Sequence, residues 1–187
     1  MGTAALAGLS AEQLSHLTDD QIAALGTAHV AALTGEQLTG LTVGSVTALS
    51  STQIGVLDSN QLTAFSTAQL AAISSADIKS VGTAALHALG ADQVAAMTSD
   101  QFSAMTTAQA VALTADQLAG LTTAKLNALS SADFAVLNST QVAALTAAQV
   151  AKLETADLAA LGTAALKGLG ADAIISLTTA QAAALTT

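Results

Sequence analysis

The 187-residue sequence contains no cysteine, proline, tryptophan, tyrosine or arginine, and only three phenylalanines. The absence of cysteine excludes a disulfide scaffold and a thiolate metal site. With four lysines, no arginine and a net charge of -9, the chain lacks the basic face that nucleic acid or an anionic membrane requires. With 2% aromatic residues, we expect a thin, repetitive core rather than one deep centre of large side chains.

Long hydrophobic runs are also missing. Polar residues interrupt the chain every few positions, so no stretch approaches the roughly 18 apolar residues that a membrane-spanning helix needs. The N-terminus has neither the basic region nor the continuous apolar segment of a signal peptide. Residues 1–6 already follow the repeat described next. This indicates a segment from inside a longer array, with any targeting signal elsewhere.

What is present is one motif of eight residues, here called the octad, of which Leu113–Gly120 is a clear copy. Position one is large and apolar, position two is mostly Ser, Thr or Gly, position five is mostly Gln, position six is apolar, and position eight is small. From Met1 to Ala184 the octad occurs 23 times without insertion or deletion. Such regularity is typical of a repeat architecture.

The sequence also repeats with a longer period of 80 residues, or ten octads. Residues 1–80 and 81–160 are two copies, and residues 161–187 open a third. No linker separates the copies. We therefore predict one continuous octapeptide-repeat solenoid over residues 1–187, lengthened by duplication.

The residues at positions two and five predict a helix start in every octad. Position two holds Ser, Thr, Asp, Asn or Gly in every octad except that of Glu154, and these are the residues preferred at helix N-caps. Gln follows three residues later in 13 octads, which is the spacing of a capping box. All 13 acidic residues lie at positions two to five, and three of the four lysines lie late in the octad. That order of charges complements a helix dipole.

A single long helix does not fit the pattern. Eight residues rotate a helix by about 800°, so the apolar stripe would drift by about 80° in every octad and could not dock on a partner. Helices of roughly six residues are too short to stand alone and must stack on their neighbours. We predict an all-α solenoid with one short capped helix per octad, positions one and six inward, and small position-eight residues at close contacts between turns. The alternative is a β-solenoid, which the Thr content allows but the Ala and Gln content disfavours.

The sequence offers few candidates for chemistry. His16, His29 and His87 occupy three different octad positions and have no recurring acidic partner, so we expect solvated surface residues. Adjacent Asp19 and Asp20 are explained by the first turn of a helix. The three phenylalanines fall at positions one and six, which predicts a place in the core. We therefore predict no catalytic, cofactor-binding or metal-binding residues, no cofactor, and no enzyme activity.

The Leu-Thr-x-x-Gln-aliphatic-x-Ala pattern resembles the Ala/Thr/Gln-rich octapeptide-repeat regions of large bacterial secreted or surface proteins that are often adhesin-like. The resemblance covers the whole chain and implies an extended stalk, spacer or filament-forming segment with an extracellular or cell-surface location. As partners it suggests self-association, end to end or side by side, or an unidentified surface or polysaccharide ligand.

A binding module is the alternative function. Thr at position three, as at Thr83 and Thr107, could form a regular column that binds ice or a polysaccharide. The column is interrupted by Asp19, Gly35 and Val43. We expect the position-two hydroxyls to be occupied in helix caps.

Overall fold

The computed structural model describes residues 6–185. They group into two compact units, one within Met1–Met97 (unit 1) and one within Thr98–Thr187 (unit 2). Helices account for all the regular secondary structure in this part of the chain, which contains no strand. The prediction of an all-α repeat is therefore confirmed over the β-solenoid. That one solenoid runs continuously over residues 1–187 stays a prediction.

Each octad from residue 9 onward forms one helix of four to six residues that begins at position three. In unit 1 the helices are α2 (Ala11–Ser15), α3 (Asp19–Ala23), α4 (Thr27–Ala31), α5 (Gly35–Thr39), α6 (Val43–Thr47), α7 (Ser51–Gly55), α8 (Ser59–Thr63), α9 (Thr67–Ala72), α10 (Ser75–Ile78), α11 (Thr83–Ala88) and α12 (Ala91–Ala96). In unit 2 they are α13 (Ser99–Ser103), α14 (Thr107–Ala112), α15 (Ala115–Ala119), α16 (Thr123–Leu126), α17 (Ser131–Ala135), α18 (Ser139–Ala143), α19 (Ala147–Val150), α20 (Thr155–Ala160), α21 (Thr163–Leu166), α22 (Ala171–Ile175) and α23 (Thr179–Ala184).

The helices begin where the N-caps were predicted. In α15, for example, the Thr114 side chain accepts from the backbone amide of Gln117 at 3.1 Å, and the Gln117 side chain accepts from the Thr114 amide at 2.8 Å. The first hydrogen bond satisfies an orphan amide of the helix and the second satisfies the amide of the cap itself. Glu154 at the start of α20 makes no side-chain cap bond, as its residue type predicted.

Successive helices are joined without glycine-dependent turns. In most octads position eight keeps right-handed helical angles, and position two is extended in every octad from Ser10 to Thr178. Among the described residues no backbone has a positive φ. The reversal therefore needs only ordinary conformations, so any small residue can occupy position eight unless a neighbouring turn approaches it.

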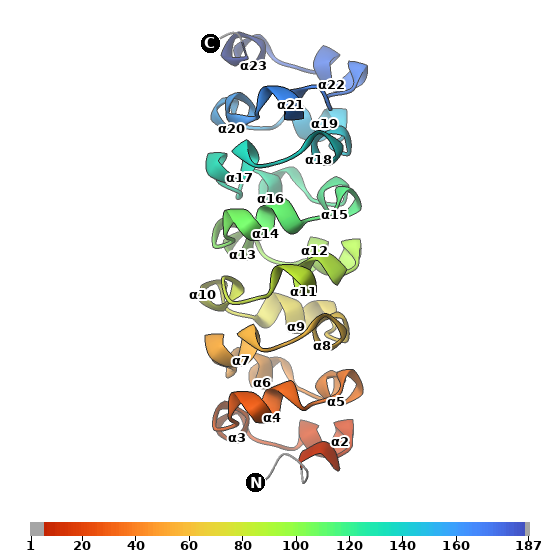
Figure 1. The fold of residues 1–187 in the computed structure, drawn as a ribbon, viewed down its shortest axis with the longest axis vertical. Helices are drawn as coiled ribbons and strands as arrows, with labels where there is room; N and C mark the ends of the chain where they lie inside the picture. The colour runs from red at the N-terminus through yellow and green to blue at the C-terminus, as the bar shows by residue number, and fades with distance from the viewer. Residues whose placement is uncertain (1–5, 186–187) are drawn as a thin grey trace. The chain divides into compact units, whose positions relative to one another are not determined.

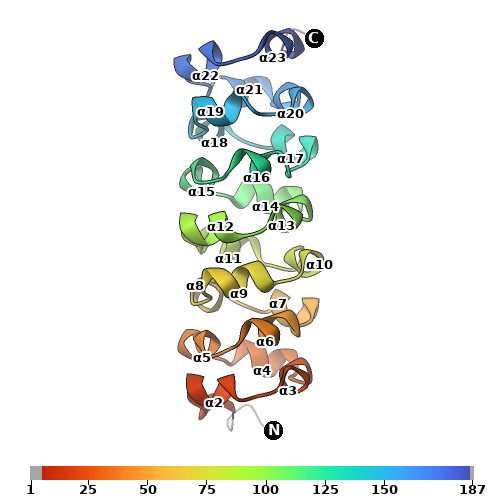
Figure 2. The same ribbon diagram turned by 180° about the vertical axis from the view of Figure 1, so that it is seen from behind.

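Helices three octads apart pack against each other within each unit. In unit 1 the contacts α2 with α5, α5 with α8 and α8 with α11 follow this rule, and in unit 2 α14 with α17, α17 with α20 and α20 with α23 do the same. Figure 1 shows α2, α5 and α8 one above another on the right of unit 1, and Figure 2 shows the same helices from behind. Each unit is therefore a solenoid in which the chain meets its preceding turn after three octads.

The core is made by the two predicted inward positions. Position six is buried in every octad from Leu6 to Leu158, and position one in every octad from Leu33 to Leu161. The phenylalanines at these positions, Phe65, Phe102 and Phe134, are at most 2% exposed, which confirms their predicted place in the core. Because each helix is too short to be stable alone, this burial between turns is what holds it.

Close contacts at position eight are confirmed at two of its glycines, Gly40 and Gly168. A Cβ on Gly40 would lie 2.0 Å from the Ala11 carbonyl oxygen, and one on Gly168 would lie 2.1 Å from the Ser139 carbonyl oxygen. Both contacts join one turn to the turn before it. Glycine is required here by space and not by backbone angles.

Candidate functional site

The histidines do not come together. Nδ1 of His16 lies 2.7 Å from the carbonyl oxygen of Glu12, on the surface of α2. His29 stands at position five of α4, where its Nδ1 accepts from the Gly26 amide at 3.1 Å. It therefore takes the part that Gln plays in other octads. His16 and His87 are exposed, as predicted, whereas His29 is half-buried and takes part in the cap of α4.

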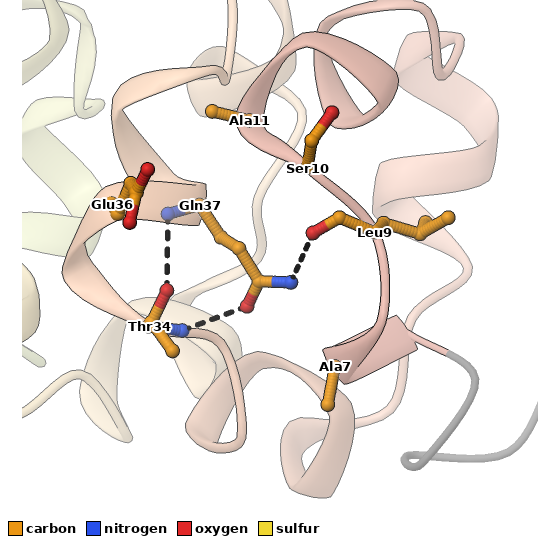
Figure 3. A pocket seen from close by; sticks show the side chains of 7 residues that line it. All are labelled: Ala7, Leu9, Ser10, Ala11, Thr34, Glu36 and Gln37. Atoms are coloured by element: carbon orange, nitrogen blue, oxygen red, sulfur yellow. Dashed lines mark hydrogen bonds between the residues drawn. The ribbon is translucent and has the colours of Figure 1, made fainter.

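The structure reveals a second role for the position-five glutamines, and Gln37 is one example (Figure 3). Its Oε1 accepts from the Thr34 amide at 2.9 Å, which closes the capping box of α5. Its Nε2 donates to the carbonyl oxygens of Leu6 at 3.0 Å and Leu9 at 2.8 Å, which belong to the preceding turn. One amide group thus satisfies the start of its own helix and the end of another.

The same bonds recur along both units. We call this set the glutamine ladder: in it, Nε2 of a position-five Gln donates to backbone carbonyls 28 to 31 residues earlier. It includes Gln37, Gln53, Gln61, Gln69 and Gln93 in unit 1, and Gln141, Gln149 and Gln181 in unit 2. The acceptors lie at or just beyond helix C-termini, where the last carbonyls have no partner within the helix. The ladder therefore couples the N-terminus of each helix that has a ladder Gln to the helix end of the preceding turn.

The ladder explains a bias that capping alone does not. A capping box accepts Glu as well as Gln, yet Glu never occupies position five in this chain. Glu could accept from the cap amide, but its second oxygen would face the carbonyl oxygens of the preceding turn. The ladder residues other than Gln93 are at most 5% exposed, so a charge there would also be desolvated. The sequence prediction missed this role, and the absence of Glu was the signal for it.

Two buried aspartates replace Gln in unit 2. Asp133 is 3% exposed, and its Oδ2 accepts from the Ser130 amide at 2.9 Å, so it closes a capping box. Its Oδ1 is buried and has no hydrogen-bond partner. Asp157, 4% exposed, accepts at Oδ1 from the Ser131 hydroxyl at 2.6 Å. Aspartate at position five therefore brings no amide to donate to the turn below.

A cavity of about 260 Å³ opens beside Gln37, between α2 and α5 (Figure 3). Its lining includes two hydroxyls, from Ser10 and Thr34, and one carboxylate, from Glu36. Both hydroxyl oxygens accept from backbone amides in helix caps. These hydroxyls at the cavity thus serve the backbone of the solenoid.

The hydroxyls of the repeat divide into two sets. Those at position two are engaged in caps, as predicted, in every described octad that has Ser or Thr there, from Ser10 to Thr178. Most of those at position three, such as Thr83 and Thr107, are exposed. Binding of ice or polysaccharide by the position-three column stays a prediction.

Within residues 6–185 no three His, Asp or Glu side chains are grouped as metal ligands would be. The helices of that range are also too short and too polar to include one that could cross a membrane. The recurring constellation in the described chain is therefore the one formed by the N-cap, the position-five Gln and the carbonyls of the preceding turn.

Short capped helices joined by this constellation define an α-helical repeat solenoid. The chain belongs to the ALTTAQ repeat family, whose model matches residues 1–27, 70–107, 111–147, 123–155 and 150–187. In octad register these six letters run from position eight to position five. They are the small residue, the apolar anchor, the N-cap, the first helical turn and the ladder Gln, as in Ala144–Gln149. A search of curated proteins finds no match.

Proposed function

We propose that this chain is a non-catalytic structural repeat that serves as an extended stalk or spacer in a bacterial surface or secreted protein. The observation that carries the proposal is the glutamine ladder. An octad with a ladder Gln brings its own cap, its own apolar anchors and its own bond to the preceding turn. Adding octads therefore adds turns of the same cross-section and requires no new kind of contact.

The chemistry of the repeat supports a non-catalytic role. Catalysis needs unlike groups converging at one place. In this chain the recurring polar groups are hydroxyls and amides already bonded to backbone, as at Thr146 and Gln149. The proposed surface location rests on the resemblance to bacterial octapeptide arrays.

Small-angle scattering tests the spacer role. A compact domain of this length has a radius of gyration of roughly 16 Å. We expect a clearly larger value for the 187-residue chain, and a further increase in proportion to length when residues 81–160 are duplicated once more. A radius of gyration near the compact value for both proteins would contradict the proposal. Labelling of intact cells with an antibody against the repeat tests the location separately, because only an exposed array would bind the antibody.

A further inference from the structure

The glutamine ladder is interrupted where one 80-residue copy of the sequence meets the next. Position five is Ala85 in the octad of α11 and Ala165 in the equivalent octad 80 residues later, that of α21. Position two is Gly82 in the first octad and Gly162 in the second, and neither helix has a side-chain cap bond. These two octads therefore lack both the cap hydroxyl and the ladder amide.

Two backbone groups that a position-five Gln would satisfy have no partner at α11. In the 28-residue register of the ladder, the acceptor for position five of α11 is the carbonyl oxygen of Leu57. Within residues 6–185, no hydrogen bond reaches this oxygen or the amide of Gly82. The same holds in α21 for the Leu137 carbonyl and the Gly162 amide. Apolar packing therefore holds α11 to α8 without a ladder bond.

The next helix along the chain shows what the ladder adds. α11 and α12 are each six residues long, and the N-cap of α12, Gly90, is also a glycine. Position five of α12 is Gln93, which accepts from the Gly90 amide at 2.9 Å and donates to the Phe65 carbonyl oxygen at 2.9 Å. The two neighbouring helices therefore share a length and a glycine cap but not a ladder Gln.

The octads just before α11 and α21 extend each gap in the ladder. Position five is Asp77 in α10 and Asp157 in α20, and an ionised carboxylate has no hydrogen to donate to a carbonyl. Asp77 bonds to Ser74 of its own cap. Asp157 accepts from the Ser131 hydroxyl at 2.6 Å, which leaves one polar bond to the preceding turn. Two successive octads therefore lack a ladder bond at each of these places.

We propose that α11 and α21 are release points, at which a turn separates from the preceding turn before the laddered octads open. Local opening of a folded protein occurs where the fewest contacts hold the structure. These places recur with the 80-residue period, so each added copy of the sequence brings one more. In a stalk under tension, opening at the release points lengthens the array while the laddered octads stay folded.

Hydrogen exchange resolved to single amides compares α11 with α12. The Leu86 amide and the Val94 amide each donate to the carbonyl oxygen of a glycine cap at 3.0 Å, and both residues are buried. After correction for intrinsic rates, we expect the Leu86 amide of the unmodified chain to exchange roughly tenfold faster, the effect of about one net hydrogen bond. Equal rates for the two amides would overturn the release point.

Gln93→Ala removes the ladder side chain from α12 and adds no bulk. The Val94 amide should then exchange about as fast as the Leu86 amide, a gain of roughly tenfold. The Leu38 amide of α5, which donates to the Thr34 carbonyl oxygen at 3.1 Å, is the internal control and should keep its rate. An unchanged rate for Val94 would also overturn the inference.

Ala85→Gln is the reverse change, because its amide reaches the two unbonded backbone groups in ladder register. The Leu86 amide should then exchange roughly tenfold more slowly. Ala84→Gln adds the same side chain at an exposed position of α11 and should leave the rate within about threefold. Circular dichroism shows whether Ala85→Gln keeps its helices. If the longer side chain disrupts the fold, the result for Gln93→Ala decides the question.

The mechanical use of the release points rests on the proposed spacer role, and pulling on single chains tests it. The unmodified chain should show a first extension at low force, which Ala85→Gln combined with Ala165→Gln moves to higher force. An unchanged first extension would rule out this use. A chain that is elongated in scattering but has equal exchange at Leu86 and Val94 removes the release points and leaves the spacer. A compact particle with unequal exchange removes only the spacer.

Discussion

Nε2 of Gln149 donates to the carbonyl oxygen of Leu121 at 2.8 Å, although 28 residues separate the two in the chain. The same nitrogen lies 3.1 Å from the Leu118 carbonyl oxygen, and Oε1 accepts from the Thr146 amide at 2.7 Å. One side chain therefore links a helix start to the helix end of the preceding turn. In this solenoid polar bonds and apolar burial act at the same interface.

Gln149→Glu separates capping from the contact between turns. In the variant, Glu still accepts from the Thr146 amide. A charged carboxylate oxygen, however, replaces the donor Nε2 and faces the carbonyl oxygens of the preceding turn. We expect a loss of roughly 3 kcal/mol or more in the free energy of unfolding, the size of an uncompensated buried charge. Urea unfolding at low protein concentration measures it.

The control for that prediction is Gln21→Glu, which makes the same change at an exposed position five. A carboxylate near the helix N-terminus is mildly favourable, so the stability should change by less than about 0.5 kcal/mol. Equal losses in the two variants would show that the bonds to the preceding turn contribute nothing.

Leu113→Ala and Thr114→Ala compare an anchor with a cap in the same octad. Leu113 is 2% exposed, so its truncation should cost roughly 2–5 kcal/mol. Thr114 accepts from the Gln117 amide at 3.1 Å, and its loss should cost on the order of 1 kcal/mol. Thermal unfolding should therefore show the larger shift for Leu113→Ala. Small and equal shifts would contradict the inward assignment of position one.

Asp133→Gln should stabilise the chain. The buried Oδ1 of Asp133 lacks a partner, whereas Gln141 in the next octad donates to Leu113 at 2.8 Å. By the same register a Gln at position 133 would reach the carbonyl of Met105. Replacing an unsatisfied buried oxygen by a donor should raise the free energy of unfolding by about 1–3 kcal/mol. Asp116→Gln removes an exposed charge and serves as the control, with an expected change within about 0.5 kcal/mol.

Glu154→Ser should repair the N-cap of α20. Glu154 makes no side-chain cap bond, and Asp157 follows it at position five. Ser130 and Asp133 already show a working cap with that combination, since the Ser130 hydroxyl accepts from the Asp133 amide at 3.3 Å. The gain should be about 0.5–2 kcal/mol in urea unfolding. An unchanged midpoint would mean that α20 does not depend on its cap.

The local structure could be predicted from the sequence because its causes lie within one octad. Thr114 and Gln117 are three residues apart and can only cap the same helix, so their spacing predicts where that helix begins. The burial of Leu113 follows from the recurrence of large apolar residues at position one. Both signals are repeated in register many times, which makes them far stronger than one isolated match.

The contacts between turns could not be predicted in the same way. The partner of Gln149 at Leu121 is a backbone carbonyl, so no residue type marks it in the sequence. The number of octads in a turn depends on how small angles at each junction add up, and no single residue sets them. Only the absence of Glu at position five indicated that Nε2 of the Gln side chain makes a hydrogen bond of its own.

Gly40→Ala tests how closely the turns approach. In a helical segment Ala is normally favoured over Gly by up to about 1 kcal/mol. At Gly40 the new Cβ would lie 2.0 Å from the Ala11 carbonyl oxygen, so two backbones would have to separate. Overpacking of this kind costs roughly 1–3 kcal/mol and outweighs the helical gain. We therefore expect a net destabilisation in urea unfolding.

Gly55→Ala is the matched control, because it sits one octad position earlier and also faces a carbonyl of another turn. Its Cβ would lie 3.3 Å from the Ser80 carbonyl oxygen, a gap that a shift of a few tenths of an ångström makes comfortable. The helical gain should then prevail, and Gly55→Ala should be neutral or stabilising by up to about 1 kcal/mol. If both variants were stabilised alike, the turns would have to be more loosely packed at Gly40 than its contact with Ala11 implies.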